Sequence, residues 1–283
     1  MSTLRDIRNR LRSAENIKKI TDAMERVAAA RLRRAQAKAE QSRSYTSSLK
    51  EVLENLAAAE SSHPLFEQRQ VKKIGLVVIT ADRGLSGSYN TNLLSAADKF
   101  LKNYRADQIE LIVLGRKAID YYRRKNWQVR YQLAEWGGKI TFHDIKVFSN
   151  QLVNWFLAGE FDEIWLIYTH YINIMNNKIL VEKFLNIGKP TTEKPTAYLD
   201  YIFEPSLEEI LAELLPRYCV TRIQSALNEA YASELASRIM AMRAASKNSE
   251  EMIDTLTLMR NKMRQRDITR EMIEISSGAE SLK

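Results

Sequence analysis

IRNRLRSAENIKKITDAMERVAAARLRRAQ, residues 7–36, is the stretch that decides the fold. Its apolar residues recur every three or four positions, which is the spacing of one face of an α-helix. From residue 28 to 39 the apolar pattern thins into mostly Ala, Arg, Lys and Gln, which favour helix. We predict one helix that runs to about residue 59. Its apolar stripe consists of Leu4, Ile7, Leu11, Ala14, Ile17, Ile20, Met24 and Val27.

The C-terminal segment has the same character, since residues 189–277 contain no Gly. A helical pattern starts at Leu207 and continues to about Gly278, which we expect to mark the helix end. Pro216 should kink its first turns rather than end the helix, because helix-forming residues resume directly after it. The predicted stripe consists of Leu227, Tyr231, Leu235, Met242, Ala245, Met252, Leu256, Met259 and Met263.

Two long helices at the ends of one chain each need a partner for their apolar stripe. The simplest arrangement pairs them as an antiparallel coiled coil. Because the C-terminal helix is longer, part of it should project unpaired. A projecting apolar helix predicts another protein that encloses it.

Between the helices, strand-like and helix-like runs alternate, which indicates a doubly wound α/β unit. The predicted helices are 92–104, 116–124 and 143–158. The predicted strands are 74–80, 109–114, 127–132, 163–170 and 178–185, and the last is a candidate for an antiparallel strand. The predicted fold class is therefore α+α/β: an antiparallel coiled coil of long N- and C-terminal helices plus a central Rossmann-like α/β domain. The expected boundaries are 1–60 for the N-terminal helix, 72–190 for the central α/β domain and 206–283 for the C-terminal helix that pairs with 1–60.

The charge is concentrated at one end. The formal net charge is +8, and residues 1–43 carry 12 Lys and Arg against 5 Asp and Glu. Such a segment favours an anionic partner, which can be nucleic acid, a membrane or an acidic protein surface. The single Cys219 excludes an internal disulfide, and its setting on a helix predicts an inert packing residue. His63, His143 and His170 are too scattered to predict a metal site.

The turn ADRGLSGSYN, residues 81–90, follows a strand and precedes a helix, as a phosphate-binding loop would. However, GLSG is not GxGxxG, and the chain has no GxxxxGK[ST]. Asp82 and Arg83 lack a nucleophile or a metal partner, so we expect no catalytic residue and no cofactor. Two alternatives stay open, a basic coiled-coil protein that binds nucleic acid and an α/β enzyme that uses this turn.

Four stretches together resemble the gamma subunit of F-type ATP synthases, the central rotor shaft, and the resemblance covers the whole chain. They are residues 7–36, ITADRGLSGSYN at 79–90, DYIFEPS at 200–206, and SRIMAMRAASKNSEEMIDTLTLMRNKMRQRDITREMIEISSGAESL at 237–282. The chain departs from the family pattern at Ser86, Ser88, Arg260 and Arg270. A lone Cys219 also excludes the dithiol switch of the chloroplast form.

The resemblance implies a non-catalytic subunit that couples proton flow through a membrane ring to ATP synthesis on partner subunits. The implied partners are the alpha and beta subunits of the catalytic ring, the epsilon subunit and the membrane c-ring, with no nucleic acid. The implied location is peripheral, on the cytoplasmic side of a bacterial plasma (inner) membrane.

The resemblance also implies residue roles. Met24, Arg238, Gln265 and Thr269 match positions that contact the catalytic ring, although coiled-coil packing is an equal alternative for Met24. Arg266 adds a cation that suits an acidic beta-subunit loop. Tyr201 and Glu204 match the foot that meets the membrane ring. For Arg33 and Arg34 we expect contact with an acidic sleeve, and the alternative is a solvated helix face.

Overall fold

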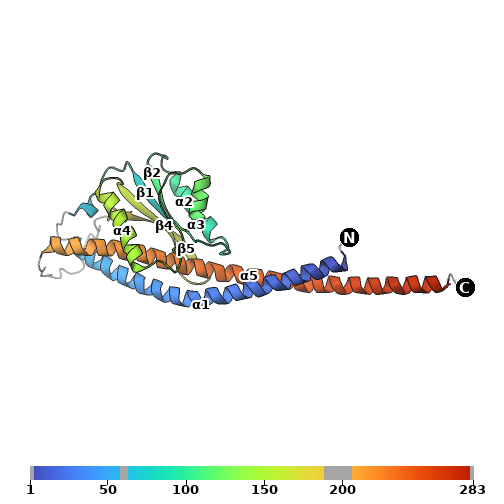
Figure 1. Cartoon of the computed structure of the whole chain (residues 1–283). Helices are drawn as coiled ribbons and strands as arrows, with labels where there is room; N and C mark the ends of the chain where they lie inside the picture. Colours follow the sequence, from blue (N-terminus) through green and yellow to red (C-terminus); the bar gives the residue numbers. More distant parts are fainter. Residues whose placement is uncertain (1–2, 58–62, 188–205, 281–283) are drawn as a thin grey trace. The chain divides into compact units, whose positions relative to one another are not determined.

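The computed structural model describes residues 3–57, 63–187 and 206–280 (Figure 1). Its two long helices are α1, Leu4–Ala57, and α5, Leu207–Glu280. The chain forms two compact units. The first contains residues 1–28 and 239–283, and the second contains residues 29–238.

The second unit contains one five-stranded sheet. Its strands are β1, Ile74–Ile79; β2, Ile109–Leu114; β3, Val129–Leu133; β4, Glu163–Tyr171; and β5, Asn177–Leu185. Their order is β3-β2-β1-β4-β5. The first four strands are parallel, and β5 runs antiparallel to β4. This is the strand order of a doubly wound Rossmann-like sheet, so the predicted fold class is confirmed.

Helices cover both faces of this sheet, as Figure 1 shows. The short helices are η1, Pro64–Phe66; α2, Tyr89–Leu101; α3, Arg116–Arg124; and α4, Phe142–Leu157. Side chains of β1 alternate between two cores: Leu76 and Val78 pack with α2 and α3, whereas Val77 and Ile79 pack with α4 and α5. Because both faces are buried, β1 reads as a continuous apolar run.

Helix α2 begins three residues before the predicted start and ends three residues before the predicted end. Its first residue, Tyr89, is buried, and its hydroxyl donates a hydrogen bond to the carbonyl oxygen of Ala230 at 3.1 Å. A contact across 141 positions sets this boundary, and the local pattern does not reveal it. Strand β3 likewise lies one to two residues beyond the predicted 127–132.

In the first unit, the two helices pair in an antiparallel direction with a constant register. Lys18 pairs with Glu250 at 2.7 Å, and the hydroxyl of Ser246 donates to Asp22. Glu25 then accepts from Arg243 at 2.9 Å. As the residue number rises along α1, the partner's number falls by the same step. The predicted antiparallel coiled coil is therefore confirmed, with a seam that contains polar side chains.

Part of the predicted stripe of α1 is wrong. The buried residues of this helix in the first unit are Ile7, Leu11, Ala14, Thr21 and Ala28. They fit the alternating steps of four and three that hold a seam against its partner. The predicted stripe instead takes three successive steps of three after Leu11, which rotates it away from the seam. As a result, Ile17, Ile20 and Val27 are 50%, 58% and 52% exposed.

The predicted stripe of α5 fails in the same way at two positions. Met242 and Leu256 are buried, but Met252 and Met259 are exposed because they lie beside the seam. Gly278 does not end the helix, which continues to Glu280. Pro216 lies inside α5, which continues past it as predicted.

Candidate functional site

The turn after β1 is fixed by its own side chains. One carboxylate oxygen of Asp82 accepts the backbone N–H groups of Arg116 at 3.1 Å and Glu135 at 2.7 Å, and the other accepts that of Gly137 at 3.3 Å. The hydroxyl of Thr80 accepts the backbone N–H of Ala118 at 2.9 Å. These side chains hold neighbouring loops in place, which favours the interpretation that the turn serves backbone geometry.

Arg238 connects this turn to α5. Its guanidinium donates to the carbonyl oxygen of Gly84 at 3.2 Å and to the carboxylate of Glu234 at 2.6 Å. Burial raises the pKa of Glu234, and the charge of Arg238 opposes that rise. Both side chains are largely buried, so Arg238 braces the turn. The i,i+4 spacing of Glu234 and Arg238 is the signal in the sequence for their ion pair.

Residues 264–279 of α5 are all exposed. Gln265, Arg266 and Thr269 all lie there, and the hydroxyl of Thr269 donates to the carbonyl oxygen of Gln265 at 2.9 Å. Large apolar side chains stand among them at Ile268, Met272, Ile273 and Ile275. A dense set of exposed apolar side chains on a helix marks an interaction surface.

The remaining predicted contact residues have different settings. Met24 is half-buried, as suits either of its two interpretations. Arg33 and Arg34 are both exposed, but only Arg34 lines a cavity of the second unit. Tyr201 and Glu204 lie outside the described residues. The structure thus brings Gln265, Arg266 and Thr269 together on one exposed stretch of α5, whereas of Arg33 and Arg34 only Arg34 reaches the cavity.

The described residues contain no group of three or more His, Cys, Asp or Glu side chains arranged to hold a metal ion. Over the same residues, no helix has the length and apolar character that crossing a membrane requires.

Comparison with known proteins decides the family. The family model described as ATP synthase matches residues 3–282. The chain is 53% identical to the ATP synthase gamma chain of Protochlamydia amoebophila (strain UWE25) and 42% identical to that of Moorella thermoacetica (strain ATCC 39073 / JCM 9320). Each alignment covers all of both chains. The chain belongs to the gamma-subunit family of F-type ATP synthases.

Solved structures agree with this membership. The central stalk/c-ring structure of Tetrahymena thermophila mitochondrial ATP synthase contains a chain with a TM-score of 0.64 and 25% identity, covering 80% of this chain and 99% of that one. A chain of the Euglena gracilis mitochondrial ATP synthase gives a TM-score of 0.71 over 99% of this chain and 94% of that one, and at 17% identity it supports the fold. As a gamma subunit, the chain is a rotor component of the central stalk, and the prediction of its function is confirmed. These relatives give no support to the nucleic-acid alternative.

Proposed function

We propose that this gamma subunit transmits torque between a membrane c-ring and the catalytic alpha and beta subunits, with epsilon beside it on the stalk. The complex would sit on the cytoplasmic side of a bacterial plasma membrane. The observation that carries the proposal is the paired first unit, in which apolar side chains such as Ile17 and Ile20 point away from the helix seam. Side chains that the chain itself leaves uncovered suit an enclosing partner.

The mechanism follows from the unequal faces of the shaft. Met24, Gln265, Arg266 and Thr269 occupy particular positions along the two helices, so a rotating shaft presents a different surface to each catalytic site in turn. Contacts with the shaft differ from one catalytic site to the next, and they drive each site through successive states. The difference in contact free energy is the coupling between distinct sites. Arg238 can join these contacts because its guanidinium has donors beyond those bonded to Gly84 and Glu234.

Torque transmission also requires contacts with the membrane ring and with the catalytic ring. Tyr201 and Glu204 are proposed to meet the polar loops of the membrane ring. Arg33 and Arg34 are proposed to seat the shaft by attraction to acidic side chains of the catalytic ring. Reversal of both charges, Arg33→Glu with Arg34→Glu, should weaken assembly, and undiminished assembly with coupled proton pumping would refute this seating role.

The test is co-expression with the other subunits of an ATP synthase, followed by co-purification with the alpha and beta subunits and by ATP-driven proton pumping in inverted membrane vesicles. Arg266→Gln should lower pumping more than ATP hydrolysis, because it weakens a contact that the rotating shaft makes. Arg264→Gln is the matched control, since Arg264 is also exposed, carries the same charge and lies two residues earlier on α5. A chain that does not co-purify with the catalytic ring would refute the proposal.

A further inference from the structure

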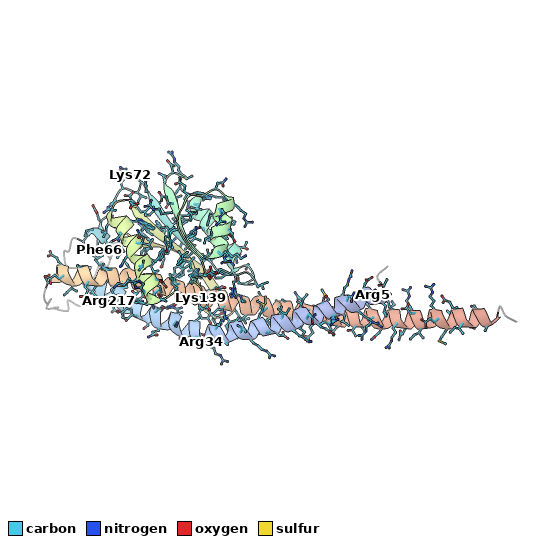
Figure 2. All side chains as sticks on the ribbon, in the orientation of Figure 1. Arg5, Arg34, Phe66, Lys72, Lys139 and Arg217 are labelled. Atoms are coloured by element: carbon cyan, nitrogen blue, oxygen red, sulfur yellow. The ribbon has the colours of Figure 1, made fainter. Side chains whose placement is uncertain are left out.

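A cavity of about 580 Å³ lies within the second unit, between α1, the turn after β1, the loop between β3 and α4, and α5. Its volume falls in the range of small-molecule sites. Figure 2 labels two of its basic residues, Arg34 on α1 and Lys139 on the loop between β3 and α4. The proposed function uses two of its lining residues, Arg34 and Arg238, but gives no role to the cavity itself.

The wall of the cavity carries a large excess of positive charge. Seven of its lining residues are Lys or Arg and three are Asp or Glu. Each of the three acidic residues already has partners: Glu135 pairs with Arg116 at 2.9 Å, Glu234 pairs with Arg238, and Asp82 accepts backbone N–H groups. The internal acids therefore leave much of the basic charge without a counterpart.

Four of these cations have no ion pair or hydrogen bond with any residue of the described ranges. They are Arg31, Arg34, Lys38 and Arg83. The first three follow a spacing of three and then four, which puts them on one face of α1. Arg83 approaches from the turn after β1, on a different element. Cations that converge from two elements on one cavity form a site for an anion with several charged oxygens.

The part of the lining that contains Trp136 and Gly138 is held by contacts within the chain. Trp136 is buried, and its indole N–H donates to the carbonyl oxygen of Thr80 at 2.9 Å. Gly138 has a φ of +71°, and a Cβ there would lie 2.6 Å from the hydroxyl oxygen of Tyr231. This close approach fixes the loop against α5 before any ligand arrives. A preformed lining lowers the entropic cost of binding a ligand.

We propose that this cavity binds a small anion with a chain of phosphate groups, either free pyrophosphate or the phosphate chain of a nucleotide. Arg34 from α1 and Arg83 from the turn after β1 bind the terminal oxygens, and Arg31 and Lys38 add charge along α1. A bound anion would link α1 to the turn after β1, and so would stiffen the second unit. This inference goes beyond the torque-transmitting role and does not depend on it.

The test is calorimetric titration of the full chain with pyrophosphate at about 0.15 M salt, where charges on exposed surfaces are screened beyond about 8 Å. Arg34→Gln and Arg83→Gln should each raise the dissociation constant for pyrophosphate at least about fivefold. This corresponds to the loss of one charge-assisted contact. Arg33→Gln is the matched control, because Arg33 is the adjacent exposed residue with the same charge but does not line the cavity. It should change the constant less than about twofold.

Parallel titrations with ATP, without magnesium, distinguish the two sources of the phosphate chain. Tripolyphosphate is titrated beside ATP, because it carries the same number of phosphate groups. ATP binding that is equal to or weaker than that of tripolyphosphate means that only the phosphates are recognised, and tighter binding of ATP means that the nucleoside contributes; these outcomes support the site. Absence of saturable binding, or an equal loss in the Arg33 and Arg34 variants, would overturn the proposal. Binding of an acidic peptide with no binding of pyrophosphate or ATP would also overturn it.

Discussion

Arg43 and Glu229, 186 positions apart, form an ion pair in which the guanidinium Nη2 lies 2.6 Å from the carboxylate Oε1. The Glu229 side chain is only 2% exposed. Its second oxygen accepts the backbone N–H of Tyr171 at 2.8 Å and lies 3.1 Å from Nδ1 of His170. One buried carboxylate therefore links α1, β4 and α5 within the second unit.

Removal of the Arg43 guanidinium from this ion pair should destabilise the fold. We expect Arg43→Ala to lower the free energy of unfolding by about 2–4 kcal/mol, because it leaves the buried carboxylate of Glu229 without its guanidinium. Chemical denaturation measures the change. Arg105→Ala is the control, since its pair with Asp107 at 3.0 Å is solvent-exposed and should be worth less than about 1 kcal/mol. Equal losses in the two variants would contradict the proposed link.

Gly115 should tolerate no side chain. Its φ is +98°, and an added Cβ would stand 2.1 Å from the carbonyl oxygen of Thr80. Gly115→Ala should therefore lower the free energy of unfolding by more than about 3 kcal/mol, through overpacking added to backbone strain. Gly159→Ala has a similar φ of +73° with no atom within 4 Å of the new Cβ, so it isolates the strain at about 1–2 kcal/mol. If thermal unfolding finds the two equally destabilised, the close approach at Thr80 has no energetic weight.

Apolar residues on and off the seam of the first unit should respond differently. Leu11 is buried in the seam, so Leu11→Ala should destabilise the paired helices by about 2–3 kcal/mol. Ile20 is exposed, so Ile20→Gln should leave the helical circular dichroism and the melting of the isolated chain unchanged. In the assembled complex, however, Ile20→Gln should lower ATP-driven proton pumping. A drop in the stability of the isolated chain with Ile20→Gln would show that Ile20 belongs to the seam.

Cys219 should react slowly with thiol reagents. Burial raises its pKa to about 12 from a usual 9.0, which lowers its thiolate fraction at pH 8 about a thousandfold. The native chain should resist a disulfide reagent at pH 8, and the denatured chain should react at once. Because the folded pKa is raised, the thiol's contribution to stability is complete below pH 9 and declines as the pH rises from 9 toward 12. Rapid reaction of the native chain at pH 8 would contradict this burial.

The sequence predicted the elements that local patterns control. Continuous apolar residues in β1 and the long helical patterns of α1 and α5 led to the correct fold class, since both signals depend on nearby residues alone. The phase of the seam was not predictable in the same way. Polar residues such as Lys18 and Thr21 lie on the seam, whereas the apolar Ile17 lies off it, so hydrophobicity alone selected the wrong face.

The candidate sites were harder to predict than the fold, because they depend on contacts between residues far apart in the sequence. The family resemblance selected Arg33 and Arg34 together, yet of these two only Arg34 lines the cavity. The cavity also needs residues of other elements, from Asp82 to Arg238, which only the folded chain brings to this face of α1. The link at Glu229 had no signal in the sequence, since its partners lie on α1 and β4. Such sites arise from packing between segments far apart in the chain.

The central claim is that this chain rotates inside the catalytic ring. Lys102→Cys places a single reactive thiol on an exposed residue directly after α2, while the buried Cys219 stays unlabelled. A bead attached to that thiol, in a complex whose alpha and beta subunits are fixed to a surface, reports the motion of the chain. We predict continuous rotation in one direction when MgATP is added, which stops when ATP is removed. A stationary bead on complexes that hydrolyse ATP at a normal rate would contradict the account.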